Sequence, residues 1–270
     1  MNEPTEARGE RIAKRIARSG LCSRRDAERL IAEGRVAVDG TKLDSPACLV
    51  TEASAIVVDG KPLPDTEPTR LWRYHKPRGL MTTHRDPQGR PTIFASLPAG
   101  LPRVISIGRL DFNSEGLLLL TNDGALARRL ELPATGWLRR YRVRVHGTLD
   151  EARLAGLAKG IEIDGVRYGA IQAALDSRKG SNAWLTVSLR EGKNREVRKV
   201  VEALGGVVTR LIRVAYGPFQ LGYLEPGAVE QVPARVLRDQ LGGDAQAKPA
   251  RGGDRNRLRA RAEQDAHRRR

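Results

Sequence analysis

The stretch GRLDFNSEGLLLLTNDG, residues 108–124, joins a short polar loop to four consecutive leucines. No polar residue alternates with the leucines, so we predict a strand that is buried on both of its faces. The preceding run RVISIGRL, 103–110, predicts a second strand. Asp111 therefore lies at the end of a strand, in a loop held between two buried strands. Gly108 and Gly116 allow this loop a positive φ or a close approach of its backbone to a ligand.

The role of Asp111 has three interpretations. A carboxylate on a well-anchored loop is a common way for a scaffold to hold a functional acid. An aspartate can equally hydrogen-bond within its own turn, and this ordinary role stays open. The residues also match the start of a calcium loop, D-x-N-x-x-G. However, the last ligand position holds Asn122 in place of a glutamate, and a buried strand follows where a helix belongs. We therefore exclude calcium.

The chain is strongly basic. Its 270 residues include 48 Lys and Arg against 32 Asp and Glu, a formal net charge of +16. Such a surplus favours a polyanionic partner: RNA, DNA or an acidic membrane surface. The sequence has neither a long apolar window nor the apolar core of a signal peptide, so we expect no membrane span and a cytoplasmic protein. Cys22, Cys48 and four scattered histidines form no metal-site pattern, so we expect no metal.

Residues 10–62 form one compositional unit. ERIAKRIARSG and RRDAERLIAEG place apolar residues at helical spacing and end at a glycine, and Ser23 is suited to cap the second helix. Two hairpin-like pieces with Asp-Gly turns follow, VAVDGTKL and AIVVDGKPL. Clustered guanidiniums on two short helices suit contacts with RNA phosphates, although a solvated face is the alternative. These arginines are Arg11, Arg15, Arg24, Arg25 and Arg29.

The rest of the chain divides by composition. PLPDTEPT is rich in proline and polar residues, so we expect a linker over 63–69. Strand-like runs such as YRVRVHG, AWLTVSLR and GVVTRLIRVAYG alternate with shorter helical ones. This order predicts an α+β domain with a largely antiparallel mixed sheet over 70–237. Residues 240–270 have no apolar period and many arginines, so we expect a disordered basic tail.

A second cluster of charge lies in REGKNREVRKVVEALGG, residues 190–206. Its valines and Leu204 recur at i, i+3, i+4 and i+7, which predicts an amphipathic helix that ends at a glycine. The first turns carry cations where the helix dipole disfavours them, so we expect an anion to meet them, either a carboxylate or a phosphate. An arginine here can pair with Asp111 and keep it ionised. The cations are Lys193, Arg195, Arg198 and Lys199.

Together these segments resemble a known family. GRLDFNSEGLLLLTNDG, HKPRG at 75–79 and EGKNREVRKVVEALGG are similar to motifs of the RsuA/RluB-type ribosomal RNA pseudouridine synthases. Residues 10–62 resemble the S4 RNA-binding domain that precedes the catalytic domain in those enzymes. The resemblance covers most of the chain, from residue 10 to about residue 235.

The resemblance implies an activity and a site. Asp111 becomes the catalytic aspartate, Tyr141 the tyrosine that packs against the target base, and Arg198 the basic residue paired with the aspartate. Lys76 and Arg109, which lie in the shared motifs, are expected to contact RNA with the cations named above. The implied isomerisation breaks the N1–C1′ bond of a flipped uridine and joins C5 to C1′. No group enters or leaves, so no cofactor is expected; the aspartate acts as a nucleophile at C1′ or a base at C2′.

The resemblance also makes ribosomal RNA the expected partner, free or in an assembling subunit, and the basic tail favours 23S rRNA of the large subunit. The chain has no coiled-coil period or repeat, so we expect a monomer. Two other classes stay open from the sequence: a non-catalytic rRNA-binding or ribosome-assembly factor, and a DNA-binding regulator in which the short helix pair is a helix-turn-helix. The hairpins after the helices and the lack of a dimerisation helix disfavour the regulator.

Overall fold

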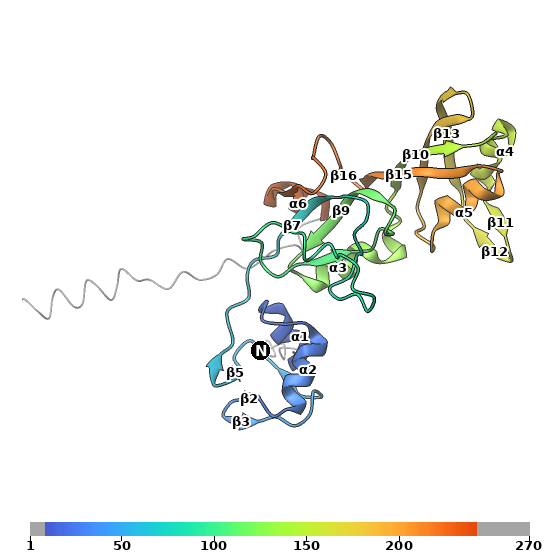
Figure 1. Cartoon of the computed structure of the whole chain (residues 1–270). Helices are drawn as coiled ribbons and strands as arrows, with labels where there is room; N and C mark the ends of the chain where they lie inside the picture. The colour runs from blue at the N-terminus through green and yellow to red at the C-terminus, as the bar shows by residue number, and fades with distance from the viewer. Residues whose placement is uncertain (1–8, 242–270) are drawn as a thin grey trace, which may run out of the picture.

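The structure, a computed structural model, describes residues 9–241. Over this range the fold is α+β, as predicted, with a small N-terminal unit followed by a nine-stranded sheet. The strand order is β13-β14-β10-β15-β9-β7-β17, with β16 beside β15 and β8 beside β9. Figure 1 shows the N-terminal unit in blue and the two halves of the sheet in the middle and at the right of the view. None of the helices in the described range is long and apolar enough to cross a membrane.

The N-terminal unit forms for local reasons. Ser23 caps the second helix as predicted, because its Oγ accepts a hydrogen bond from the backbone N of Asp26 at 3.1 Å. Both Asp-Gly turns have positive φ at both residues, the geometry of a tight hairpin. The unit comprises β1 (Glu10–Arg11), α1 (Ile12–Arg18), α2 (Arg24–Ala32), β2 (Val36–Val38), β3 (Thr41–Lys42), β4 (Leu49–Val50), β5 (Ile56–Val58) and β6 (Lys61–Pro62).

The four leucines lie in β9 (Glu115–Thr121), a strand whose residues are all buried, as predicted. Leu118 and Leu120 belong to the core on one face of the sheet, and Leu117 and Leu119 to the core on the other. The other strands of this half are β7 (Leu71–Lys76), β8 (Ile105–Ile107), β16 (Phe219–Gln220) and β17 (Val229–Gln231). The helices of this part of the chain are α3 (Gly124–Glu131), the short η1 (Pro133–Thr135) and α6 (Ala234–Leu241).

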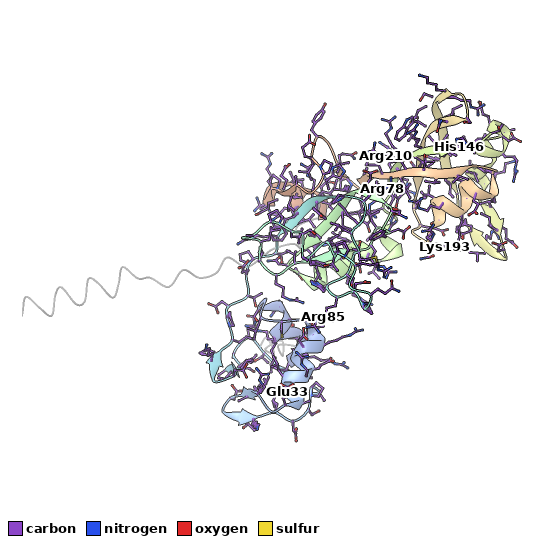
Figure 2. The ribbon with its side chains drawn as sticks, viewed as in Figure 1. Glu33, Arg78, Arg85, His146, Lys193 and Arg210 are labelled. Carbon is purple, nitrogen blue, oxygen red and sulfur yellow. The ribbon has the colours of Figure 1, made fainter. Side chains whose placement is uncertain are left out.

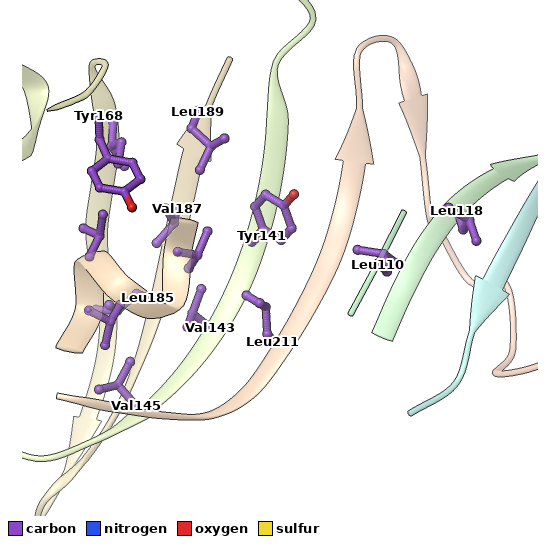
Figure 3. Packing of buried hydrophobic residues seen from close by; sticks show 14 of the residues in the cluster. Leu110, Leu118, Tyr141, Val143, Val145, Tyr168, Leu185, Val187, Leu189 and Leu211 are labelled. Atoms are coloured by element: carbon purple, nitrogen blue, oxygen red, sulfur yellow. The ribbon is translucent and has the colours of Figure 1, made fainter. Parts of the chain in front are cut away.

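The other half of the sheet is antiparallel and packs under the predicted amphipathic helix, α5 (Glu196–Ala203). Val197, Val200 and Val201 of α5 are buried in the same core as the inward side chains of the strands. Figure 3 shows these strand side chains on one face, among them Val143. This half contains β10 (Arg139–His146), α4 (Glu151–Gly156), the short helix η2 (Leu157–Lys159), β11 (Ile161–Ile163), β12 (Val166–Tyr168), β13 (Ile171–Lys179), β14 (Asn182–Leu189) and β15 (Val207–Tyr216).

The end of the quoted stretch, TNDG, ties the segment before β7 to the sheet. Asn122 Oδ1 accepts a hydrogen bond from the backbone N of Arg70 at 2.8 Å, and Asp123 Oδ2 accepts one from Thr69 Oγ1 at 2.7 Å. The other carboxylate oxygen of Asp123 caps α3. The polar residues after the leucines therefore have structural roles.

Two predicted segments lie at the borders of the sheet domain. Residues 63–69, the expected linker, contain no helix or strand. The expected tail, 240–270, lies outside the described residues except for its first two, which end α6. Helix α6 therefore continues past 237, the predicted end of the catalytic domain, and buries Leu237 against the sheet.

The two halves of the sheet meet where β9 runs parallel to β15, with Gly116 opposite Arg213. Gly116 has φ +103°, and a Cβ atom there would lie 2.7 Å from the backbone N of Arg213 and closer still to its carbonyl oxygen. Only glycine permits this approach. The positive φ expected at Gly116 is confirmed, but the close approach is to β15 and not to a ligand.

Gly116→Ala should lower the free energy of unfolding by about 3 kcal/mol or more, because positive-φ strain and a backbone clash add together. Urea denaturation measures the change. Gly124→Ala is the matched control, since the nearest heavy atom to a Cβ at that helical position is 3.8 Å away. The control should be neutral or slightly stabilising. A Gly116→Ala protein as stable as wild type would contradict the importance of this junction.

Candidate active site

A cavity of about 530 Å³ lies at the junction of the two halves of the sheet. It is bounded by the loop that carries Asp111, by the ends of β10 and β15, and by the segment that enters α5. The lining also includes two tyrosines and several cations: Tyr141, Tyr216, Arg109, Arg139, Lys193, Arg195 and Arg213. These cations outnumber the lining carboxylates of Asp111, Glu131 and Glu196, which suits a polyanionic ligand. Within residues 9–241, no three His, Cys, Asp or Glu side chains are grouped so that they could hold a metal ion.

The loop that carries Asp111 is held by its backbone carbonyls. Three of the hydrogen bonds come from β7 and the segment that follows it. They run from Lys76 Nζ to Ser114 O (2.9 Å), from Gly79 N to Phe112 O (2.8 Å) and from Thr82 Oγ1 to Leu110 O (2.7 Å). Lys76 and Gly79 belong to HKPRG, so in this structure that motif positions the loop.

Arg198 holds the same loop from the side of α5. Its Nη2 donates to Asn113 O at 3.0 Å, and its Nη1 donates to Val208 O at 3.2 Å. A turn inside the loop adds a hydrogen bond from Ser114 N to Asp111 O at 3.0 Å. Each carbonyl of residues 110–114 therefore has a donor, which fixes the backbone that carries the carboxylate.

The cation within 4.0 Å of the Asp111 carboxylate, among the described residues, is Arg195. Its Nη1 lies 4.0 Å from Asp111 Oδ2, and the aspartate side chain is 35% exposed. Arg195 precedes α5 with φ +53°, in the left-handed region that non-glycine residues rarely adopt and that is enriched at functional sites. The sequence predicts Arg198 as the partner of Asp111. In the structure the Arg198 guanidinium hydrogen-bonds to backbone carbonyls, and Arg195 is the cation that reaches within 4.0 Å of the carboxylate. Burial lowers the pKa of Arg198, while the nearby Asp111 acts to raise it.

Tyr141 lines the cavity from β10 and is 8% exposed. It lies opposite Arg213 of β15, and Leu211 of the same strand also lines the cavity. Figure 3 shows the Tyr141 ring at the border of the core, with its hydroxyl directed away from Val143 and Leu211. An aromatic ring in the wall of a cavity is suited to stack on a base.

Among the cavity residues that the sequence did not single out are Leu211, Arg213 and Tyr216. Arg213 is buried, and its Nε donates to Leu117 O at 2.7 Å. Its guanidinium lies 5.2 Å from the centre of the Tyr216 ring. The alternation in TRLIRVAYG places Leu211 and Arg213 on one face of a strand, and this signal was present in the sequence.

The sequence predicts Lys76 as an RNA contact, and this prediction is wrong for the folded chain because the side chain is fully buried. Burial lowers the pKa of Lys76 to about 8, while the nearby carboxylates of Asp111 and Glu115 act to raise it. A lysine at the end of an apolar strand gives no sign of this, because its burial depends on the loop that folds over it from residues 110–114.

The other predicted RNA contacts are found at several places. Those that line the cavity are Arg109, Lys193 and Arg195, and Lys199 is exposed on α5. Of the predicted contacts in the N-terminal unit, Arg11, Arg24, Arg25 and Arg29 are exposed. Arg29 forms ion pairs with Asp26 at 3.4 Å and Glu33 at 3.8 Å, and Arg15 donates to Thr66 Oγ1 at 2.7 Å. Their contacts with RNA stay predictions.

Comparison with known proteins defines the class. Residues 70–203 match the RNA pseudouridylate synthase family, and residues 10–62 match the S4 domain. An uncharacterized RNA pseudouridine synthase of Rickettsia felis is 50% identical over 228 residues, which cover 84% of this chain and 99% of that protein. The ribosomal large subunit pseudouridine synthase B of Escherichia coli O157:H7 is 40% identical over 264 residues, 93% of this chain and 91% of that protein. A crystal structure of a pseudouridylate synthase has a TM-score of 0.59 at 26% identity and covers 85% of this chain and 98% of that chain.

The protein is therefore an RNA-modifying isomerase. It belongs to the RNA pseudouridylate synthase family, in which it carries an S4 domain ahead of the catalytic domain. The resemblance to the RsuA/RluB type is confirmed. The matches do not confirm the two alternatives, a non-catalytic assembly factor and a DNA-binding regulator.

Arg198→Ala should lower turnover at saturating RNA by about 10- to 100-fold, because losing the donor to Asn113 O lets the loop shift by a fraction of an ångström or more. Arg198→Lys should not restore turnover, since one ammonium group cannot replace a guanidinium that donates to two separate carbonyls. Arg167→Ala, which removes an exposed cation on β12, is the control for net charge. Full turnover in Arg198→Ala would show that the loop does not need this arginine.

Lys76→Met tests whether the Lys76 cation is buried, through the pH dependence of the free energy of unfolding. Folding lowers the pKa of Lys76 from 10.5 to about 8, so between these values the unfolded chain binds more protons than the folded chain. The unfolding free energy of wild type should therefore rise with pH through this window, relative to Lys76→Met, by on the order of 1 to 3 kcal/mol. Urea unfolding across the window measures it, and identical pH profiles of the two proteins would contradict the burial of the charge.

Proposed function

We propose that this enzyme converts a specific uridine of 23S large-subunit ribosomal RNA to pseudouridine, with Asp111 as the catalytic carboxylate. The observation that carries the proposal is the placement of Asp111 and Tyr141, from the two halves of the sheet, in the wall of one cation-lined cavity. The volume of about 530 Å³ lies within the range of small-molecule sites, so a flipped nucleotide can enter.

The choice of ribosomal RNA rests on the relatives and on charge. The proteins from Shigella flexneri and Escherichia coli O157:H7 that are 40% identical to this chain are named ribosomal large subunit pseudouridine synthase B. The net charge of +16 favours the binding of a long polyanion, because the cations neutralise its phosphates. The S4 domain at 10–62 is joined by the linker at 63–69 to the catalytic domain at 70–237. The S4 domain binds RNA, and the exposed arginines of this domain contact phosphates.

The residues of the cavity fit the steps of the isomerisation. Cleavage of the N1–C1′ bond frees the uracil, which turns so that C5 bonds to C1′, and the proton that leaves C5 is balanced by one gained at N1. Asp111 acts on the ribose, as a nucleophile at C1′ or a base at C2′, with the Arg195 guanidinium 4.0 Å from its carboxylate. Tyr141 packs against the flipped base, while Arg109 and Lys193 contact the phosphates on either side of the flipped nucleotide.

Asp111→Asn should abolish pseudouridine formation and leave RNA affinity within a few fold, because the amide keeps the size of the carboxylate but not its charge. Chemical mapping of pseudouridines across both rRNAs, in cells that lack the gene and carry either wild type or the variant, measures the result. Asp65→Asn, the same change at an exposed position before β7, is the control. One site lost with Asp111→Asn alone supports the proposal, and an unchanged map would contradict it.

A further inference from the structure

Strand β10 sends its alternate residues to two different faces of the sheet. Tyr141, Val143 and Val145 are buried on the face that contains the cavity and the core. Arg140, Arg142, Arg144 and His146 alternate with them and point to the opposite face, and all four are exposed. The three arginines form a row with a spacing of about 7 Å along the strand.

Neighbouring strands extend this row into a basic surface. Arg210 of β15 lies opposite Arg144, and Trp184 of β14 lies opposite Arg144 on the other side. Asn182 lies between His146 of β10 and Lys179 of β13. We call this surface the outer face; it consists of Arg140, Arg142, Arg144, His146, Lys179, Trp184 and Arg210. Figure 2 shows Arg210 and His146 along one side of the strands and Lys193, which lines the cavity, on the other.

The positive charge of the outer face is only partly neutralised by the protein. Arg210 pairs with Glu115 at 2.7 Å, and Arg142 lies 3.9 Å from Asp176. The side chains of Arg140, Arg144 and Lys179 form no ion pair or hydrogen bond within residues 9–241. Arg144 and Arg210 lie directly opposite each other, and like charges in this arrangement destabilise a sheet, so an anion from outside the chain would stabilise the row.

We propose that the outer face is a second RNA-binding surface, which holds the phosphate backbone of RNA that flanks the segment in the cavity. The proposal rests on the function proposed above, because it assumes a substrate long enough to reach both faces of the sheet. Exposed guanidiniums present forked donors that match phosphate oxygens. Trp184, with the Arg142 guanidinium 4.9 Å from its ring centre, adds the aromatic surface typical of nucleic-acid interfaces.

Other polyanionic or apolar partners fit this face less well. A protein partner would need a central group of exposed apolar or aromatic anchors, and Trp184 is the one aromatic residue of the outer face. A membrane surface would need a group of apolar side chains to insert beside the cations, whereas the exposed apolar residue of the described chain that borders the row is the single Val207 opposite His146. RNA requires only the regular row of cations that is present.

The test compares two RNAs and two triple variants of the full chain. Arg140→Gln, Arg142→Gln and Arg144→Gln remove three cations from the outer face, and the matched control is the triple variant Arg128→Gln, Arg235→Gln, Arg238→Gln, whose arginines are exposed on α3 and α6. Filter binding to a 23S rRNA transcript and to a short uridine oligonucleotide is measured at several salt concentrations. Thermal unfolding shows that each variant is folded, and Arg144→Gln alone replaces the triple variant if it is not.

We expect the outer-face variant to bind the transcript at least tenfold more weakly than wild type. The slope of log K against log salt should fall by about 2 to 3, since each lost phosphate contact removes roughly 0.7 to 0.9. The control variant should lose much less affinity, and binding of the short oligonucleotide should be the same for both variants. An equal loss in both triple variants, or unchanged binding by the outer-face variant, overturns the proposal. Failure of wild type to modify or bind the transcript would instead overturn the function proposed above.

Discussion

The close contact between the backbones of Gly116 and Arg213 is the constraint on which the rest of the structure depends. It is the point at which the leucine strand joins β15 and makes one sheet of two antiparallel halves. A side chain at 116 has no space there, because its Cβ would overlap the backbone of β15. The loop with Asp111 belongs to one half and Tyr141 to the other, so the cavity between them exists only while this junction holds. The glycine is therefore needed for the site, although it takes no part in lining it.

The loop before the junction is also held by hydrogen bonds to its carbonyls, and one of these bonds requires a buried cation, which costs free energy. Its carbonyls are held by donors from three separate segments, and one donor is the fully buried Lys76. Moving a cation out of water is expensive, and burial lowers the pKa of this lysine accordingly. The carboxylates of Asp111 and Glu115 offset part of that penalty. The same cation that positions the loop thus also lies near the carboxylate of Asp111, and the two opposite charges attract each other.

Local patterns in the sequence predict much of the fold and less of the site. The leucines of β9, the cap at Ser23 and the period of α5 each act within a few residues, and each prediction is confirmed. The partner of Asp111 and the burial of Lys76 depend on contacts between segments that lie far apart in the chain. Arg195 and Arg198 are three residues apart; Arg195, which has a left-handed backbone, lies 4.0 Å from the carboxylate, while Arg198 donates to backbone carbonyls. No pattern of residue types encodes that choice.

The alternation in β10 shows how a short strand can serve two functions. In RYRVRVH the buried residues build the core and present Tyr141 to the cavity, while the arginines between them face outward. The apolar residues cannot move to the other face without loss of the core, so the register that places Tyr141 at the cavity also places the arginines on the opposite face. Contacts with phosphates supply affinity without reading the sequence, whereas the cavity tests one base at a time. If the outer face binds phosphates as proposed, RNA is held by its backbone on one face of the strand while the cavity on the other face accepts or rejects the base.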